Sequence, residues 1–387
     1  MRKKLIPLLL IFLLSPTLLF SSPWSYMYEG VEGHPEILGG ILPTYTHMGA
    51  NYEGWSFLEN RETRLELLLG LGYTQRKIWQ NPNAGSPLFD DPLVFDVVRT
   101  NWSVRLNQSL DGKNHISPYI GYEGTFEYYL DSMVQGSSRQ NGSTAYPVQS
   151  IATWFSPSSV NSPYYPDLKG ADTTMLGTTL VAGLSYTDMK NTLVTSDGFS
   201  SDLSFRYAPT VLNNLLDGTA SFYSINGTSR YAKTLYSLKD AKDLNVYSIV
   251  VSDKVNLNWT NGNAVPLYYQ GPVSLGQKMR GFSAWTYNTQ FTAINSFDLR
   301  FSGPEPFFSG IFPRMNLFLD IGYALGNYFN SSVSYGGVFL ASSGVQLAVA
   351  IFDYLDLGYQ LAFLLAGHNY ENYNDTIVGS VTLTLKL

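Results

Sequence analysis

Two aspartates on neighbouring strand-like segments are the residues of this sequence best placed for specific chemistry. Asp298 lies in the segment Ile294–Phe301 and Asp320 lies in the segment Asn316–Tyr323, with a proline-rich turn between the two segments. Both aspartates alternate with apolar residues, so we expect them on the polar face of their strands. Carboxylates on one shared face attract a basic group. Such a group could fold in from the preceding long loop, which carries the basic segment Gln277–Phe282.

Residues for catalysis or metal binding show no recognisable arrangement. The chain has no cysteine, no Gly-x-Ser-x-Gly motif, and four histidines without a catalytic context: His34, His47, His115 and His368. We therefore expect no enzymatic activity, no bound metal and no cofactor. The net charge of −6 gives no reason to expect nucleic-acid binding.

The elements that must carry these aspartates show a period of two along much of the chain. Such alternation places apolar residues on one strand face and polar or small residues on the other. The longer segments have roughly the 9–11 residues that a tilted strand needs to cross a bilayer, whereas strands of a soluble β-sandwich average nearer 5–6. The clearest alternating segments are Arg64–Thr74, Ile120–Leu130, Leu176–Tyr186, Asp202–Tyr207, Lys254–Trp259, Met315–Tyr323, Leu355–Phe363 and Val381–Leu387.

The composition favours a membrane barrel over a soluble protein. Aromatic residues reach 15% and charged residues only 14%, yet the mean hydropathy is −0.05 because lipid-facing and lumen-facing residues cancel. We predict an all-β protein, a single transmembrane antiparallel β-barrel of sixteen strands with a lumen-folded loop. Reaching sixteen requires the weak strand candidates Trp24–Tyr28 and Tyr146–Phe155.

The chain divides into an export signal and the barrel. Residues 1–22 have a positive start, an apolar run and small residues at the end, which predicts a signal peptide. Residues 23–387 form the barrel, with long loops at Asp131–Thr174 and Thr260–Thr292 and a short turn at Lys239–Asp243. The aromatic pairs Tyr128-Tyr129 and Tyr268-Tyr269 are expected at the membrane interface. We expect a wet lumen lined by the acidic residues Glu66, Glu123, Glu127 and Asp202.

The order of motifs in residues 260–387 resembles a known family of outer-membrane barrels. Met279–Phe282 matches a hydrophobic-Arg-Gly-Phe/Tyr loop motif, and Asp298 precedes a proline-containing turn. Phe318, Asp320 and Gly322 then match Phe-x-Asp-x-Gly. This order is similar to that of the bacterial surface antigen domain, found in the outer-membrane insertase and two-partner-secretion transporter superfamily of BamA, TamA and FhaC type.

The resemblance implies roles for individual residues. In that family the sixth extracellular loop folds into the lumen, and its arginine pairs with inward acids of the next two strands. Carried over, Arg280 pairs with Asp298 and Asp320, Gly281 permits a close approach to the wall, and Phe282 seats the loop tip. A solvated loop arginine is the alternative for Arg280.

The resemblance also implies a function. Family members usually carry periplasmic POTRA modules, but the strand-like segment Ile37–Thr46 follows the expected signal too closely for one, so we expect the branch without POTRA modules. We expect a monomeric assembly or translocation factor in the bacterial outer membrane. Its expected partners are outer-membrane lipid, unfolded outer-membrane protein or lipid substrates, and an unknown periplasmic partner. The alternative is a passive diffusion pore or a structural surface antigen or adhesin.

Overall fold

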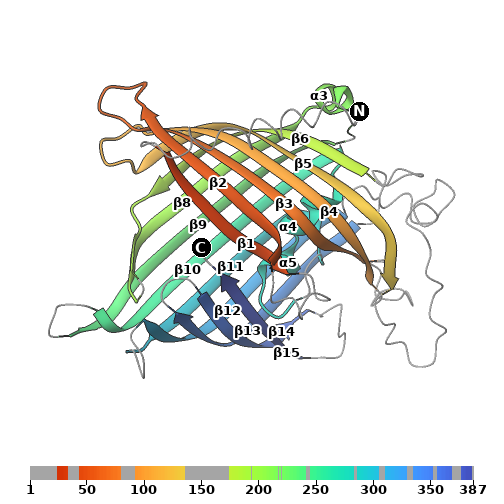
Figure 1. Cartoon of the computed structure of the whole chain (residues 1–387). Coiled ribbons are helices and arrows are strands. Elements are labelled where there is room, and N and C mark those ends of the chain that lie inside the picture. The colour runs from red at the N-terminus through yellow and green to blue at the C-terminus, as the bar shows by residue number, and fades with distance from the viewer. Residues whose placement is uncertain are drawn as a thin grey trace, which may run out of the picture.

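The protein folds as one antiparallel β-barrel (Figure 1). The computed structural model describes residues 24–33, 43–79, 92–135, 174–192, 194–216, 218, 220–240, 245–282, 286–304, 310–328, 334–351, 355–367 and 376–385. Within the sheet, each long strand pairs with its neighbour in the sequence, from β1 to β15. The edge strands β1 and β15 approach each other, with Cα atoms closer than 8 Å.

The strands are long, and several extend well beyond the span of a bilayer. Their bounds are β1 Trp24–Gly33, β2 Pro43–Trp55, β3 Thr63–Trp79, β4 Pro92–Gln108, β5 Ile116–Gln135, β6 Thr174–Thr187, β7 Lys190–Asn191, β8 Ser196–Ala208, β9 Ser221–Lys239, β10 Asn245–Ala264, β11 Thr289–Ser302, β12 Ile311–Tyr328, β13 Ser334–Ile351, β14 Leu355–Ala366 and β15 Ile377–Leu385. The short helices are α3 Thr210–Leu215, α4 Leu267–Val273 and α5 Leu275–Lys278.

The alternation predicted from the sequence separates the outer face of the barrel from its lumen. On β12, four alternate residues are 37–42% exposed on the outside: Leu317, Leu319, Ile321 and Tyr323. Between them, Phe318 and Asp320 point inward and are only 5% and 0% exposed. On β8, Leu203, Phe205 and Tyr207 are likewise exposed, whereas Ser204 is buried. An apolar outer face around a polar interior is the arrangement that a membrane-spanning barrel requires.

The described sheet contains fewer strands than expected. Fourteen strands follow one another in the sheet, and the two-residue β7 pairs only with β8. Trp24–Tyr28 lies in β1, as predicted, but Tyr146–Phe155 lies outside the described residues. Because β5 pairs directly with β6 up to the partners Tyr128 and Thr174, no further strand stands between them in the described sheet. The described residues therefore account for fourteen long strands and the short β7.

Connections on the two sides of the barrel differ in length. The turns after β2, β4, β9 and β11 are short, and β1 begins and β15 ends on this same side. The connections after β5, β8 and β10 are longer, and the last two contain α3, α4 and α5. Among the described residues, no helix has both the length and the apolar character needed to cross a membrane. The segment of interest is the connection between β10 and β11, residues 265–288, which we call the lumen loop.

Candidate functional site: the docked lumen loop

The lumen loop turns inward from the end of β10 and packs against the inner wall (Figure 1). It holds the short helices α4 and α5, and its two limbs are joined by hydrogen bonds between backbone atoms. The amide of Leu275 donates to the carbonyl of Tyr287 at 3.4 Å, and that of Gly276 donates to Thr286 at 3.2 Å. The loop is therefore a folded hairpin whose tip presents Arg280 to the wall.

Arg280 binds both aspartates that the sequence placed on the polar strand face. Its Nε donates to Oδ2 of Asp320 at 2.9 Å and its Nη2 donates to Oδ1 at 2.6 Å, so the pair is bidentate. The backbone amide of Arg280 also donates to Asp320, at 2.9 Å. Nη1 donates to Asp298 at 2.5 Å. A planar guanidinium fork matches two carboxylates in a way that a lysine ammonium does not.

Burial makes the pair with Asp320 the stronger of the two contacts. The side chain of Asp320 is fully buried, that of Arg280 is 19% exposed and that of Asp298 is 25% exposed. A buried carboxylate without its partner costs several kcal/mol, about 3–5 when one member of a pair is removed. The ion pairs of Arg280 with Asp298 and Asp320 thus hold the loop tip against the wall.

Two wall residues complete the seat of the arginine. The guanidinium carbon of Arg280 lies 4.0 Å from the ring centroid of Phe318, within the range of a cation–π contact. On β13, the hydroxyl of Ser342 donates to the backbone carbonyl of Arg280 at 2.6 Å. The motif residue Phe318 therefore forms part of the site itself, and Ser342 is a contact that the sequence did not indicate.

Gly281 sits where only glycine fits comfortably. Its φ of +89° lies in the left-handed region, which side chains with a Cβ rarely adopt. A Cβ added there would lie 2.8 Å from the Cβ of Ala362 and 3.0 Å from Cδ2 of Leu364. The glycine thus allows the loop to turn directly against β14.

The second motif glycine, Gly322 on β12, makes room for the loop from the side of the wall. A Cβ at Gly322 would lie against the sulfur of Met279 and 3.1 Å from both methyl carbons of Leu275. Leu275 and Met279 are 0% and 3% exposed. Two loop side chains therefore occupy the space above a glycine in the strand.

An apolar cluster surrounds the ion pairs at the loop tip. Phe282 is 8% exposed and its ring meets that of Tyr287 edge-on, with centroids 6.4 Å apart. The cluster joins loop residues to β11, β12 and β13 through Ile294, Ala324 and Leu340. Excluding water around the guanidinium strengthens its bonds to the aspartates.

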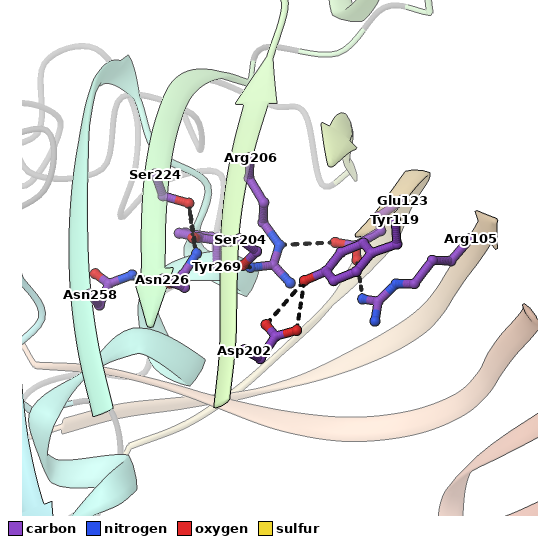
Figure 2. Close-up of polar contacts among 10 residues, drawn as sticks. All are labelled: Arg105, Tyr119, Glu123, Asp202, Ser204, Arg206, Ser224, Asn226, Asn258 and Tyr269. Atoms are coloured by element: carbon purple, nitrogen blue, oxygen red, sulfur yellow. Dashed lines mark hydrogen bonds and ion pairs between the residues drawn. The ribbon is translucent and has the colours of Figure 1, made fainter. Parts of the chain in front are cut away.

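Helix α4 provides a second contact, with β9, which β10 separates from β11. The Tyr269 hydroxyl lies 2.5 Å from Oγ of Ser224 on β9, and Asn226 donates to the same hydroxyl at 3.4 Å (Figure 2). The Tyr269 ring also packs on Phe222, with centroids 4.6 Å apart. The lumen loop is therefore fixed at two places, by α4 to β9 and by Arg280 to β11 and β12.

The neighbouring Tyr268 is buried by a close approach to β6. It is only 7% exposed, and a Cβ added at Gly177 would collide with its hydroxyl. Tyr129 is fully buried as well, whereas Tyr128 is 44% exposed on the outside. The expectation that both tyrosine pairs lie at the membrane interface is therefore wrong for three of the four residues. The sequence of an aromatic pair does not distinguish a lipid interface from a packed loop.

The wall beside α4 carries a polar network that faces the lumen (Figure 2). Tyr119 donates to both carboxylate oxygens of Asp202 at 3.0 Å. Glu123 accepts from Nε of Arg206 at 3.2 Å and lies 3.6 Å from Nη2 of Arg105. Arg105 also lies over the ring of Tyr119, at 4.4 Å from its centroid. The two predicted lumen acids in this network are thus already engaged.

Glu127 departs from the expected wet lumen. Its side chain is 0% exposed, and it accepts hydrogen bonds from Arg76 and, at 2.6 Å, from Tyr129. Arg99 lies 3.6 Å away on the adjacent strand β4. This is a buried ion pair that couples β3 to β5, and no solvated acid stands here.

Within the described parts of the chain, no three histidine, aspartate or glutamate side chains gather as a metal site. The contacts of the loop tip define the site as an ion-paired dock for a loop inside a β-barrel, built from Arg280, Gly281, Phe282, Asp298, Phe318, Asp320, Gly322 and Ser342.

Comparison with known proteins supports the class of fold. The chain is similar to CdiB from Escherichia coli, with a TM-score of 0.51, 11% sequence identity, and coverage of 95% of this chain and 63% of that one. It also matches BamA from Haemophilus ducreyi lacking POTRA domains 1–3, with a TM-score of 0.47, 14% identity, and coverage of 93% and 70%. For CdiB from Acinetobacter baumannii, the TM-score is 0.42 and the identity is 10%, with coverage of 94% and 59%.

The likeness concerns the fold alone at this level of identity. The chain spans less than two thirds of the length of either CdiB protein. No family model matches the sequence, and a search of curated proteins finds no match.

Proposed function

We propose that this protein is an outer-membrane assembly or translocation factor of the surface-antigen superfamily that its C-terminal motifs resemble. The observation that carries the proposal is the docked loop, in which Arg280 is bound by Asp298 and Asp320. The similarity of the barrel to that of CdiB supports the same class. Its place would be the bacterial outer membrane, as a monomer in contact with lipid.

The substrates proposed are unfolded outer-membrane proteins or lipids. A loop docked in the lumen also suits a gated diffusion pore, so the dock favours the proposed class only together with the C-terminal motifs that surround it. We infer that the docked loop, held by the ion pairs of Arg280, narrows the interior of the barrel when no substrate is present.

The test compares outer-membrane composition in cells with and without this protein. Three strains complete the comparison: cells expressing wild-type protein, Arg280→Ala or Arg64→Ala. Arg64 is the matched control, because its ion pair with Glu66 is partly exposed and joins two residues of β3 alone. The amount of folded barrel is measured in each strain, so that loss of the protein is not mistaken for loss of function.

A joint fall of several unrelated barrels or of surface lipids in cells lacking the protein supports the proposal. Recovery with wild type and Arg64→Ala, but not with folded Arg280→Ala, assigns the activity to the docked loop. An unchanged membrane, with an effect on small-solute uptake or on host-cell contact only, would instead identify a passive pore or a surface antigen.

A further inference from the structure

The two most exposed large apolar side chains of the described residues lie on the short helix α3, between β8 and β9. Val211 and Leu215 are 74% and 77% exposed. They are four residues apart, so they lie on the same face of the helix. Helix α3 itself contains no charged residue. This face is therefore an apolar surface that no described part of the protein covers.

Helix α3 lies against the outer face of the barrel wall, next to β6 (Figure 1). On β6, Leu180 and Leu184 are 48% and 47% exposed on the outside. Thr178 belongs to the same outer face by the period of the strand, yet it is fully buried. Its hydroxyl donates to the side-chain oxygen of Asn213 on α3, at 3.3 Å. The helix therefore covers the wall from the side that faces lipid.

Asn213 fixes the orientation of α3 on the wall. Its side-chain oxygen accepts a hydrogen bond from the backbone amide of Thr178 at 2.7 Å, and its side-chain nitrogen donates to the Thr178 carbonyl at 3.1 Å. The same nitrogen donates to the carbonyl of Pro209 at 3.1 Å. The backbone carbonyl of Asn213 accepts from the amide of Gly218 at 2.8 Å. The exposure of Val211 and Leu215 thus belongs to a helix that is held in place.

Helix α3 stands at the level of a group of outward aromatic residues. Tyr207, near the end of β8, pairs with Leu180 on β6 and with Tyr223 on β9. The Tyr223 ring meets that of Trp259 edge-on, with centroids 5.4 Å apart. Tyr207 and Trp259 are 46% and 40% exposed. Such aromatic residues mark the boundary between lipid and water in a membrane barrel. Because α3 begins at Thr210, it lies close to this boundary.

The polarity of α3 differs from one side to the other. Successive residues of a helix are rotated by about 100°. Asn213 faces the wall, so Val211 and Leu215 point almost directly away from it. One flank carries the half-buried Leu212, and the other carries the exposed Asn214. A helix with an apolar stripe beside a polar one lies in the plane of the membrane surface, with the stripe in the lipid.

We propose that α3 is an interfacial lipid anchor, whose Val211 and Leu215 insert among the acyl chains of the leaflet on the side of the long loops. Lipid is the occupant because this apolar face continues the lipid-facing surface formed by Leu180 and Tyr207. The three hydrogen bonds between Asn213 and Thr178 transmit the position of the anchor to the wall. The anchor goes beyond the proposed function, because a barrel of any activity could carry it.

The experiment places a fluorophore on single cysteines, which is straightforward because the chain has no cysteine of its own. The test variants are Val211→Cys and Leu215→Cys. Leu203→Cys, on the outer face of β8, reports full contact with lipid, since Leu203 is 55% exposed there. Lys113→Cys, in the exposed turn after β4, reports contact with water. Asn214→Cys is the matched control on α3 itself.

Each full-length labelled barrel is reconstituted into phosphatidylcholine vesicles, with and without bromine atoms on the acyl chains of part of the lipid. Bromine quenches a fluorophore only at close range, so it reports whether the label lies among acyl chains. Iodide in the buffer is the complementary quencher, because it stays in water. Folding of each variant is verified by its heat-modifiable migration on gels.

The anchor predicts that brominated lipid quenches the labels on Val211→Cys and Leu215→Cys nearly as strongly as that on Leu203→Cys. Quenching should be several times weaker on Lys113→Cys, and weaker on Asn214→Cys than on Leu215→Cys. Iodide should give the reverse order. If brominated lipid quenches the two test labels no more than that on Lys113→Cys, the anchor is overturned. Weak quenching of the test labels by both reagents would show that protein covers this face, which would overturn the anchor as well.

Discussion

Replacing Arg280 with alanine should destabilise the folded barrel strongly. The change removes a bidentate pair with Asp320, whose side chain is fully buried, and a single bond to Asp298, which is 25% exposed. Breaking a buried pair costs about 3–5 kcal/mol, and the half-solvated contact adds about 1 kcal/mol or less. Loss of the Phe318 contact adds about 1 kcal/mol. These contributions sum to about 4–7 kcal/mol. The backbone amide still donates to Asp320 and should keep about 1.5–3 kcal/mol of this, so we expect a net loss of about 3–5 kcal/mol.

The assay is urea unfolding of the purified barrel in detergent, followed by the fluorescence of its seven tryptophans. Arg280→Lys should lose less than Arg280→Ala, because it keeps the charge but not the fork. The control Arg64→Ala breaks an ion pair whose arginine is 41% exposed. It should cost about 1 kcal/mol or less.

The double variant Arg280→Ala with Asp320→Ala isolates the pair. If the two groups interact as the structure indicates, the double variant is less destabilised than the sum of the single variants, by about 2 kcal/mol or more. Unfolding of Arg280→Ala within about 0.5 kcal/mol of wild type, the usual effect of a surface change, would refute the buried pair.

Three further predictions concern the loop and one exposed turn, and urea unfolding checks each of them. Gly281→Ala should lower the free energy of unfolding by about 1–3 kcal/mol, because the φ of Gly281 is +89°. The control Gly227→Ala, where the nearest atom to an added Cβ is 3.8 Å away, should change it by about 0.5 kcal/mol or less. Equal effects of the two substitutions would contradict the close approach of Gly281 to β14. Tyr269→Phe removes the 2.5 Å contact with Ser224 and keeps the ring, so we expect a loss of about 1 kcal/mol, and no loss would mean that the hydroxyl is not bound. In the turn after β4, a backbone amide donates to Asp111 and lowers the pKa of that carboxyl. The ionised carboxylate therefore stabilises the folded state above the ordinary pKa, and this stabilisation is lost as the pH falls through the lowered pKa. Asp111→Asn should weaken the fall in the free energy of unfolding at acid pH. An unchanged pH profile of that free energy would contradict this prediction.

Much of the barrel could be predicted because a strand has a period of two. That period alone placed Asp298 and Asp320 on the inner face, where the structure has them. It did not identify their partner, since nothing local in the sequence tells where a loop folds. The family resemblance supplied Arg280. The sequence identified Gly322 only as part of a motif. Its contact with Met279 is visible only in the structure.

Other features could not be obtained from the sequence. The number of strands is only weakly encoded, because each barrel strand gives a weak signal. That β5 pairs directly with β6 in the described sheet is visible only in the structure. Tyr269 was assigned to the membrane interface, because an aromatic residue in a loop looks the same whether it faces lipid or a lumen wall. Ser342, a single serine within a strand, gives no signal at all. Docking contacts depend on pairing between distant segments, which local pattern does not encode.

The most direct test of the docked loop is a cysteine pair across the loop and the wall. The chain contains no cysteine, and the sulfur of Met279 lies against the position of a Cβ on Gly322. A barrel carrying Met279→Cys and Gly322→Cys should therefore be joined by a short bifunctional thiol reagent in intact cells, seen as altered migration of the unfolded chain. The pair Met279→Cys and Gly227→Cys, on a different part of the wall, should not be cross-linked. Failure to cross-link the first pair, in a folded barrel whose two thiols both react with a monofunctional reagent, would contradict the docked loop.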